Sequence, residues 1–308
     1  MAIFYQILLN IILPLFLLIG IGVVLQRSLK LDLSTLSAIT MNLLLPAVCF
    51  VNIYESDLSG PLVGQTLLYL MLFNVLLIGI SILIAKSNKF DRKLSATFNN
   101  SFVLSNSGNY GLPVSELVFA ANPAGISIQI IVSIFQNLLT YTYGFYNSVS
   151  TKSNGLSVFR KMMKLPVIYA LLLALPLRWL HVDIPDFLWK PIENTSNAFL
   201  AVALVTLGAQ VAFLKVTSLS RPIIWIVIGR LMISPIVAFL IISMLGLSGI
   251  TAQALFIASS FPSSRNSALL ALEYDNYPEY ASQAVLLTTI LSSFTVAVVV
   301  YLSRVLFN

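Results

Sequence analysis

Two short polar runs interrupt apolar segments of this chain, and their residues could bind a small ion. The first run is Asn106-Ser107-Gly108-Asn109-Tyr110-Gly111-Leu112-Pro113. Its glycines permit backbone geometry that other residues resist, and Pro113 lacks an N–H and breaks the ladder of helical hydrogen bonds. We therefore predict two half-helices, with Pro113 in the first turn of the second and free N–H groups pointing at the break. A simple kink that neighbouring helices satisfy is the alternative.

The second run is Ser259-Ser260-Phe261-Pro262-Ser263-Ser264-Arg265-Asn266-Ser267, which holds five hydroxyls, an amide and a guanidinium. An arginine near the bilayer centre costs at least ~2.5–3.5 kcal/mol, so Arg265 should face the protein interior and have a partner. If both half-helix N-termini meet Arg265, the site is electropositive and suits a small organic anion, whose carboxylate the guanidinium can hold with two hydrogen bonds. The predicted substrate-binding residues are Asn106, Gly108, Asn109, Gly111, Pro113, Pro262, Ser263, Ser264, Arg265 and Asn266.

Three further polar residues are candidates for coupling or gating. Glu116, three residues after Pro113, is the alternative partner for Arg265, and a pair that opens on substrate binding would also supply a protonatable carboxylate. Asn42 and Gln210 occupy roughly equivalent places in the two halves of the chain. Each could face a cavity, although an interhelical hydrogen bond is the favoured interpretation. Arg230 lies close enough to the end of its segment for its side chain to snorkel to the interface.

The composition places the chain among membrane proteins. It has 308 residues, of which 58% are hydrophobic and 9% charged, and its mean hydropathy is +0.94. The net charge of +6 does not indicate nucleic-acid binding, because the basic residues lie in short tracts between apolar segments. The single cysteine and single histidine offer neither a disulfide nor a metal cluster, and no catalytic motif appears, so we predict no cofactor and no enzyme activity.

Ten stretches are apolar and long enough to be predicted as membrane spans. They are 3–26, 34–54, 61–85, 94–121, 124–149, 165–181, 193–214, 222–245, 250–274 and 279–305. Arg27 and Lys30 follow the first stretch, the reverse of the order in a signal peptide, so we predict a retained helix with both chain termini outside.

The basic residues support this topology, since Lys and Arg should collect in alternate, cytoplasmic connections. Twelve fall on the predicted cytoplasmic side: Arg27, Lys30, Lys86, Lys89, Arg92, Lys93, Lys152, Arg160, Lys161, Lys164, Lys215 and Arg221. Three fall outside: Arg178, Lys190 and Arg304.

The longest polar connection, 150–164, divides the chain into two five-helix halves, 1–149 and 165–308. Because each half has an odd number of helices, repeated halves must be inverted relative to each other, as in many secondary transporters. The two polar runs fall in the fourth helix of their halves, so we predict an all-α polytopic membrane protein of two inverted repeats with broken fourth and ninth helices.

The string Asn106-x-Gly108-Asn109-x-Gly111-x-Pro113, together with Pro262 and the ten spans, resembles the auxin efflux carrier family, which includes the plant PIN carriers and many bacterial members. The resemblance implies a scaffold domain and a transport domain, each drawn from both repeats, with an architecture related to the bile acid:sodium symporters. It implies that the fourth and ninth helices cross at Pro113 and Pro262, and that Asn109 contacts a substrate carboxylate. The long central loop of the plant carriers is reduced here to 150–164.

We therefore predict a carrier in the plasma (inner) membrane that moves small organic anions, such as auxin-like monocarboxylates or malate-like dicarboxylates, by alternating access. An anion channel or a membrane sensor derived from a transporter is the alternative. The expected partners are the substrate and the lipid bilayer, and a homodimer is one oligomeric state open to the chain.

Overall fold

The chain is all-helical in the part that the computed structural model describes, residues 9, 13–55, 60–148, 166–213 and 219–307. The first half contains α2 (Leu13–Leu29), α3 (Leu33–Ile39), η2 (Thr40–Leu44), α4 (Leu45–Glu55), α5 (Gly60–Ser87), α6 (Arg92–Val103), η3 (Ser107–Gly111), α7 (Leu112–Val118), α8 (Pro123–Leu139), η4 (Thr140–Gly144) and α9 (Phe145–Ser148). The second half contains α11 (Pro166–Trp179), α12 (Asp186–Val211), α13 (Arg221–Ile228), η5 (Gly229–Ile233), α14 (Ser234–Met244), α15 (Gly249–Ser259), α16 (Arg265–Glu273) and α17 (Pro278–Leu306).

Five helical runs in the described residues are long and apolar enough to cross a membrane: Leu33–Glu55, Gly60–Ser87, Pro123–Ser148, Arg221–Met244 and Pro278–Leu306. The two predicted broken spans appear as pairs of short helices, α6 with α7 and α15 with α16, so no single helix there has the length of a span. Ten spans and external termini therefore stay predictions. The predicted connection 150–164 lies outside the described residues.

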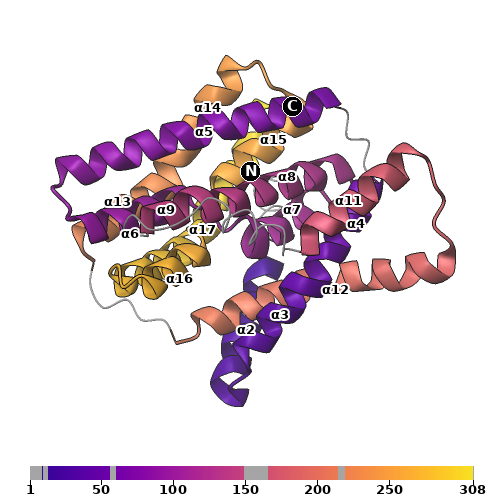
Figure 1. The fold of residues 1–308 in the computed structure, drawn as a ribbon, viewed down its shortest axis with the longest axis horizontal. Coiled ribbons are helices and arrows are strands. Elements are labelled where there is room, and N and C mark those ends of the chain that lie inside the picture. The colour runs from indigo at the N-terminus through magenta and orange to yellow at the C-terminus, as the bar shows by residue number, and fades with distance from the viewer. Residues whose placement is uncertain (1–8, 10–12, 56–59, 149–165, 214–218, 308) are drawn as a thin grey trace.

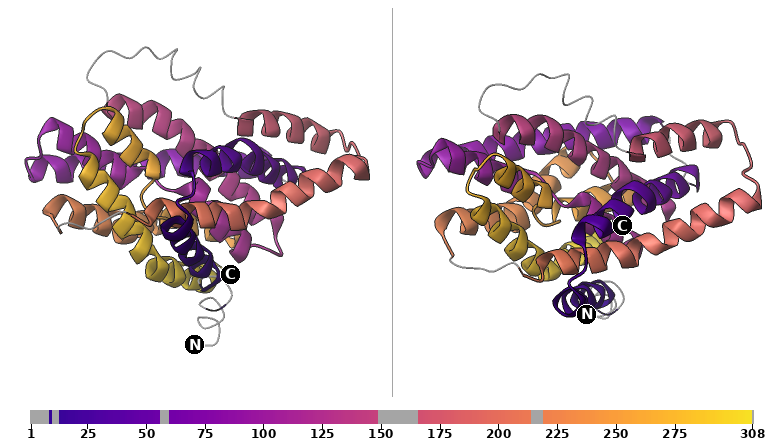
Figure 2. Two further views of the ribbon diagram at one scale, coloured as in Figure 1. Left: turned by 90° about the horizontal axis from the view of Figure 1, so that it is seen from below. Right: turned by 60° about the horizontal axis from the view of Figure 1, so that its bottom comes forward.

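The helices form two packed groups (Figure 1). In the first group α2 packs on α12 and α4 packs on α11. In the second group the two broken helices, α6–α7 and α15–α16, pack among α5, α8, α13, α14 and α17. Both views of Figure 2 show the separation, with α11 and α12 at one side and α16 and α17 at the other. The groups meet where α4 packs on α8, and where α12 packs on α7 and η3.

Two glycines allow the close packing of α2 and α12. A Cβ atom added at Gly22 would overlap the carbonyl oxygen of Val205, and one added at Gly208 would overlap that of Ile19. Such small residues let helix backbones approach closely in membranes, where association depends on packing rather than on water. The reciprocal pair therefore fixes the geometry of the first group.

This packing gives a prediction with opposite signs at neighbouring glycines of α2. Gly22→Ala should lower the stability of the protein in detergent by about 1–3 kcal/mol, because the methyl group forces the helices apart. Gly20→Ala is the matched control, since nothing lies within 4 Å of a Cβ there, and it should leave stability unchanged or raise it by up to about 1 kcal/mol. Thermal unfolding of both variants checks the prediction, and equal shifts would contradict it.

Candidate functional site

The two polar runs lie against each other in the structure. Ser105 and Ser263 form an antiparallel bridge, in which the N–H of Asn106 donates to the Pro262 carbonyl at 2.8 Å and the N–H of Ser264 donates to the Leu104 carbonyl at 2.8 Å. Each break thus supplies partners for the main chain of the other. This arrangement meets the requirement that irregular backbone inside an apolar protein be satisfied internally.

The first break differs in detail from the sequence prediction. Its unwound part is Leu104–Asn106, which precedes the glycines, and a π-helical turn, η3, then runs directly into α7. Pro113 lies in the first turn of α7, as expected. Gly111 lies within the π-helical turn, where a Cβ would overlap the ring of Phe261, so this glycine serves close packing rather than the break itself.

The second break ends at a capped half-helix. The hydroxyl of Ser264 accepts the N–H of Asn266 at 3.2 Å, which caps the start of α16. Ser263 is fully buried, and its hydroxyl donates to the Ser101 carbonyl at 2.6 Å while its N–H donates to the Thr288 hydroxyl at 3.0 Å. Ser263 therefore holds the crossing together rather than facing a ligand.

Arg230 does not snorkel, so that prediction is wrong. Its side chain is completely buried and donates to four main-chain carbonyls at 2.9–3.4 Å. These belong to Phe102 and Val103 at the end of α6 and to Ser259 and Phe261 at the end of α15. A helix C-terminus carries free carbonyls and partial negative charge, so one guanidinium satisfies the C-terminal ends of both half-helices.

The opposite, N-terminal ends of the half-helices line a pocket. Its described lining from the crossing is Ser105–Asn109 and Ser264–Asn266, facing Gln136, Asn137 and Thr140 on α8 and η4, with Met41 and Leu45 on η2 and α4. The pocket is narrow, with a cavity volume of about 30 Å³. Three π-helical turns, η2, η3 and η4, contribute to this lining, and such turns are frequent at functional sites.

Several polar groups in the pocket are free to bind a ligand. The side-chain nitrogen of Asn106 is buried without a hydrogen-bond partner, and the structure shows no side-chain hydrogen bond for Asn109 within the described chain. Arg265 is half-buried and donates from one nitrogen to the Ser37 hydroxyl at 3.2 Å. The described lining contains this cation and no acidic residue. Amides, a guanidinium and two helix N-termini together favour an anion.

The pocket contains six of the ten predicted binding residues. Asn106, Gly108, Asn109, Ser264, Arg265 and Asn266 line it, whereas Gly111, Pro113, Pro262 and Ser263 lie in the crossing behind it. The predicted binding residues did not include seven others that line the pocket: Met41, Leu45, Ser105, Ser107, Gln136, Asn137 and Thr140. The Gln136-Asn137 pair was the available signal, because two amides in succession are unusual in an apolar span.

The alternative pair of Glu116 and Arg265 is not formed among the described residues, where the Arg265 side chain donates to Ser37. Glu116 is half-buried on α7. Asn42 is exposed and donates to the carbonyl of Ala38 in its own helix at 2.9 Å, so it neither faces the pocket nor links helices. Gln210 does form an interhelical hydrogen bond, to the Ser37 hydroxyl at 3.2 Å.

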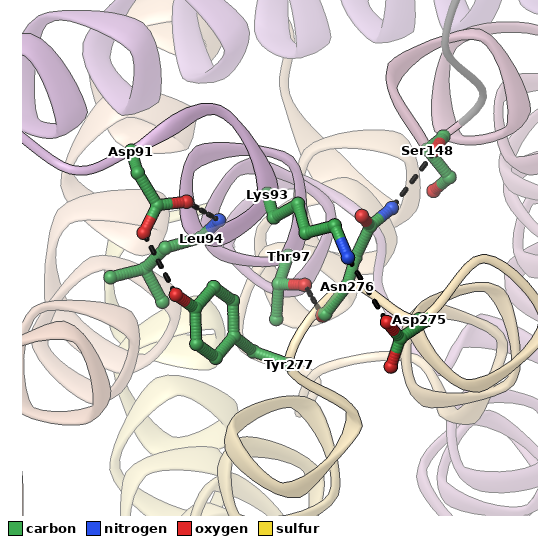
Figure 3. Close-up of polar contacts among 8 residues, drawn as sticks. All are labelled: Asp91, Lys93, Leu94, Thr97, Ser148, Asp275, Asn276 and Tyr277. Atoms are coloured by element: carbon green, nitrogen blue, oxygen red, sulfur yellow. Dashed lines mark hydrogen bonds and ion pairs between the residues drawn. The ribbon is translucent and has the colours of Figure 1, made fainter.

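A second set of contacts ties the outer ends of the broken helices together (Figure 3). Lys93 on α6 forms an ion pair with Asp275 at 3.0 Å, and the Thr97 hydroxyl donates to the Asn276 carbonyl. The Asn276 side chain donates to the Ser148 carbonyl at 2.9 Å. Asp275 and Tyr277 have positive φ angles of 52° and 47°, a conformation that non-glycine residues adopt rarely and that these contacts hold in place.

Asp91 completes this set of contacts. Its carboxylate accepts the Leu94 N–H at 2.9 Å, which caps α6, and the Tyr277 hydroxyl at 3.0 Å. The Leu94 N–H first, and the Tyr277 hydroxyl to a lesser extent, hold the pKa of Asp91 below its ordinary value. The hydrogen bond to Asp91 in turn raises the pKa of Tyr277.

The chain is similar throughout most of its length to a membrane transport family and to proteins named as transporters. The family model described as "Membrane transport protein" matches residues 7–300. An uncharacterized transporter of Methanothermobacter thermautotrophicus is 26% identical over 267 residues, which cover 85% of this chain and 86% of that protein. An uncharacterized transporter of Methanocaldococcus jannaschii is 23% identical over 273 residues, covering 85% and 87%.

A third similarity covers about half of each chain. A Rhizobium meliloti protein, provisionally named a malonate transporter, is 26% identical over 151 residues, which are 49% of this chain and 47% of that protein.

The carbonyl contacts of Arg230 predict a strong effect on stability. Arg230→Met should lower the free energy of unfolding in detergent by at least about 2 kcal/mol, because buried carbonyls lose their donor. Arg230→Lys should recover only part of this loss, since an ammonium lacks the planar fork that reaches several carbonyls. The control is Arg221→Met, at the exposed start of the same helical run. Equal melting temperatures for the Met variants at positions 221 and 230 would refute the role assigned to Arg230.

The Asp91–Tyr277 contact predicts a pH-dependent effect of Tyr277→Phe. A lowered carboxyl pKa stabilises the fold above the unfolded-state pKa, and this stability is lost as pH falls through the folded-state pKa. The melting temperature of Tyr277→Phe should therefore lie below that of the wild type from about pH 5 to 9, and the difference should shrink below about pH 4. Tyr146→Phe, at an exposed tyrosine, should show no such dependence. A pH-independent difference for Tyr277→Phe would contradict the assignment.

Proposed function

The chain belongs to the membrane transport protein family, as its resemblance to the auxin efflux carriers predicted, and from this premise we propose that it is a secondary carrier of small organic anions. The observation that supports this most is the pocket at the crossing. It combines an arginine, two amides without hydrogen-bond partners in the described chain and the N-terminal ends of two half-helices. An anion would be stabilised by all of these groups.

The proposed substrates are small carboxylates. Arg265 would hold one carboxylate with two N–H groups, as guanidinium and carboxylate geometry favours, and Asn106 and Asn109 would donate to a second carboxylate or to another acceptor. The pocket has room for about two water molecules, so it would have to widen to admit even a short dicarboxylate. The name of the Rhizobium meliloti relative suggests malonate as the first compound to try. Malate-like dicarboxylates and auxin-like monocarboxylates remain within the proposed class.

Alternating access is the proposed mechanism. Met41 and Leu45 belong to the first helix group, whereas the rest of the pocket lining belongs to the second. A displacement of one group against the other would therefore open the pocket without breaking the crossing. The packing of α2 on α12 and of α4 on α11 supports the proposal of inverted repeats. The earlier helix of each pair in one half contacts the later helix of the pair in the other half. The first group would be the scaffold domain and the second the transport domain.

Glu116 is the proposed coupling residue. It lies on α7, which packs against α12 of the other helix group, and it has no ion-pair partner within the described residues. A lone carboxylate in an apolar interface is costly when charged. If this interface slides during transport, protonation of Glu116 would lower the cost, and the carrier would move protons with the anion.

The proposed location is the plasma membrane, in which the chain would be embedded through several membrane-spanning helices. A channel or a sensor derived from a transporter is the competing function. A carrier binds its substrate in every cycle, so its flux saturates with concentration and an excess of substrate on one side drives countertransport. A channel would show neither behaviour.

Transport by purified protein in proteoliposomes tests the function and the site together. The wild type should take up radiolabelled malonate, or another short carboxylate, with saturation and countertransport. Arg265→Ala should reduce apparent affinity by roughly 10–100-fold, because a hydrogen bond to a charged group contributes about 1.5–3 kcal/mol. Asn109→Ala should reduce it by roughly 2–10-fold, since a neutral hydrogen bond contributes about 0.5–1.5 kcal/mol.

The matched controls are Asn42→Ala and Arg221→Ala, which remove the same side-chain types from exposed positions outside the pocket. Both should transport like the wild type. Normal transport by Arg265→Ala and Asn109→Ala would show that the anion binds elsewhere. A wild type that moves no carboxylate, or that conducts without saturation, would refute the proposed carrier.

A further inference from the structure

A hydrogen bond of Arg265 crosses the boundary between the two helix groups. Arg265 begins α16, in the group that contains the crossing, and one of its terminal nitrogens donates to the hydroxyl of Ser37 on α3 at 3.2 Å. Ser37 also accepts the side-chain N–H of Gln210 on α12 at 3.2 Å. The guanidinium that lines the pocket is thus linked to α12 of the opposite group and to α3, which packs on α12.

The link is chemically incomplete. A guanidinium has five N–H donors. In the described chain the Arg265 side chain makes one hydrogen bond, to the neutral hydroxyl of Ser37. The oxygen of Ser37 receives two donors, so both of its lone pairs are in use. The side-chain oxygen of Gln210 is buried and has no hydrogen-bond partner among the described residues. These groups form a contact that a better acceptor could displace.

We infer that Ser37 is a stand-in acceptor that holds Arg265 while the pocket is empty, and that an entering carboxylate displaces it and so releases α16 from α3 and α12. This inference rests on the proposed anion carrier. A carboxylate carries a full negative charge and can take two donors of the guanidinium at once, whereas the Ser37 hydroxyl is a neutral acceptor that takes one. The exchange is therefore favourable for a carboxylate, whereas a neutral amide gains no such ionic interaction.

The displacement of Ser37 would make the pocket selective for negatively charged ligands. A carboxylate breaks the Arg265–Ser37 contact when it binds, so part of its interaction with Arg265 drives the separation of the two helix groups. A neutral molecule of the same shape leaves the contact intact and the groups joined. The pocket would then select for negative charge at the step that permits movement, in addition to the binding step.

The first test measures malonate binding to purified protein by calorimetry. Ser37→Ala removes the competing acceptor, so it should bind malonate roughly 10–100-fold more tightly than the wild type, the range expected for one hydrogen bond to a charged group. Ser28→Ala is the matched control, because the Ser28 hydroxyl bonds only to carbonyls of its own helix in the described chain. It should bind like the wild type. A merely structural Ser37 would give unchanged or weaker binding and overturn the inference.

The second test follows hydrogen–deuterium exchange in residues 33–39, which form α3. Malonate should speed exchange there in the wild type, because the helix loses its contact with Arg265, whereas malonamide, a neutral analogue, should not. Ser37→Ala without ligand should already exchange at the faster rate. Slower or unchanged exchange on adding malonate would overturn the inference even if malonate is transported. A wild type that neither binds nor transports any carboxylate would refute the proposed function, and the inference with it.

Discussion

The structure depends on one constraint: backbone that leaves a helix inside an apolar protein must find hydrogen-bond partners within that protein. Two helices break at the same level, and each break leaves free carbonyls on one side and free N–H groups on the other. The antiparallel bridge between Ser105 and Ser263 joins the unwound residues directly. Arg230 then satisfies carbonyls at the ends of α6 and α15. A positive charge that would be costly alone in the interior is stabilised here by four carbonyl dipoles whose oxygen atoms point at it.

Because Arg230 serves the C-terminal ends, the two ends of each break differ in chemistry. The carbonyl ends are closed by a protein side chain, and the N–H ends open into the pocket beside Arg265. The site therefore needs no bound cation at the crossing to balance the C-terminal dipoles, since a permanently charged residue already does so. The positive N-terminal ends and Arg265 have no acidic residue opposite them in the described lining. This distribution of charge supports the proposed anionic substrate.

The sequence predicted the features that single residues determine, and it missed those that depend on distant contacts. Gly, Pro and Ser in apolar stretches located both breaks, and the membrane class followed from composition. The position of the first break shifted, because η3 continues α7 as a π-helical turn and leaves Leu104–Asn106 unwound. Arg230 was misjudged because it lies 128 residues from Phe102 and 31 from Phe261, and nothing in its neighbourhood indicates which carbonyls it meets. The contact of Arg265 with Ser37, 228 residues away, was missed for the same reason.

The distribution of polar contacts indicates which parts of the molecule can move together. Main-chain bonds, Arg230 and the ion pair of Lys93 with Asp275 join the two broken helices at their centre and at their outer ends, so these helices should move as one unit. The boundary with the first helix group is held differently: apolar residues such as Met41 and Leu45 face the pocket, and side-chain hydrogen bonds such as Arg265 to Ser37 and Ser127 to Asn52 cross it. Sliding at that boundary exchanges a few weak contacts, whereas opening the crossing would expose many carbonyls and N–H groups that have no other partner. A rigid crossing beside a boundary held by few polar contacts supports the proposal that one pocket faces each side of a membrane in turn.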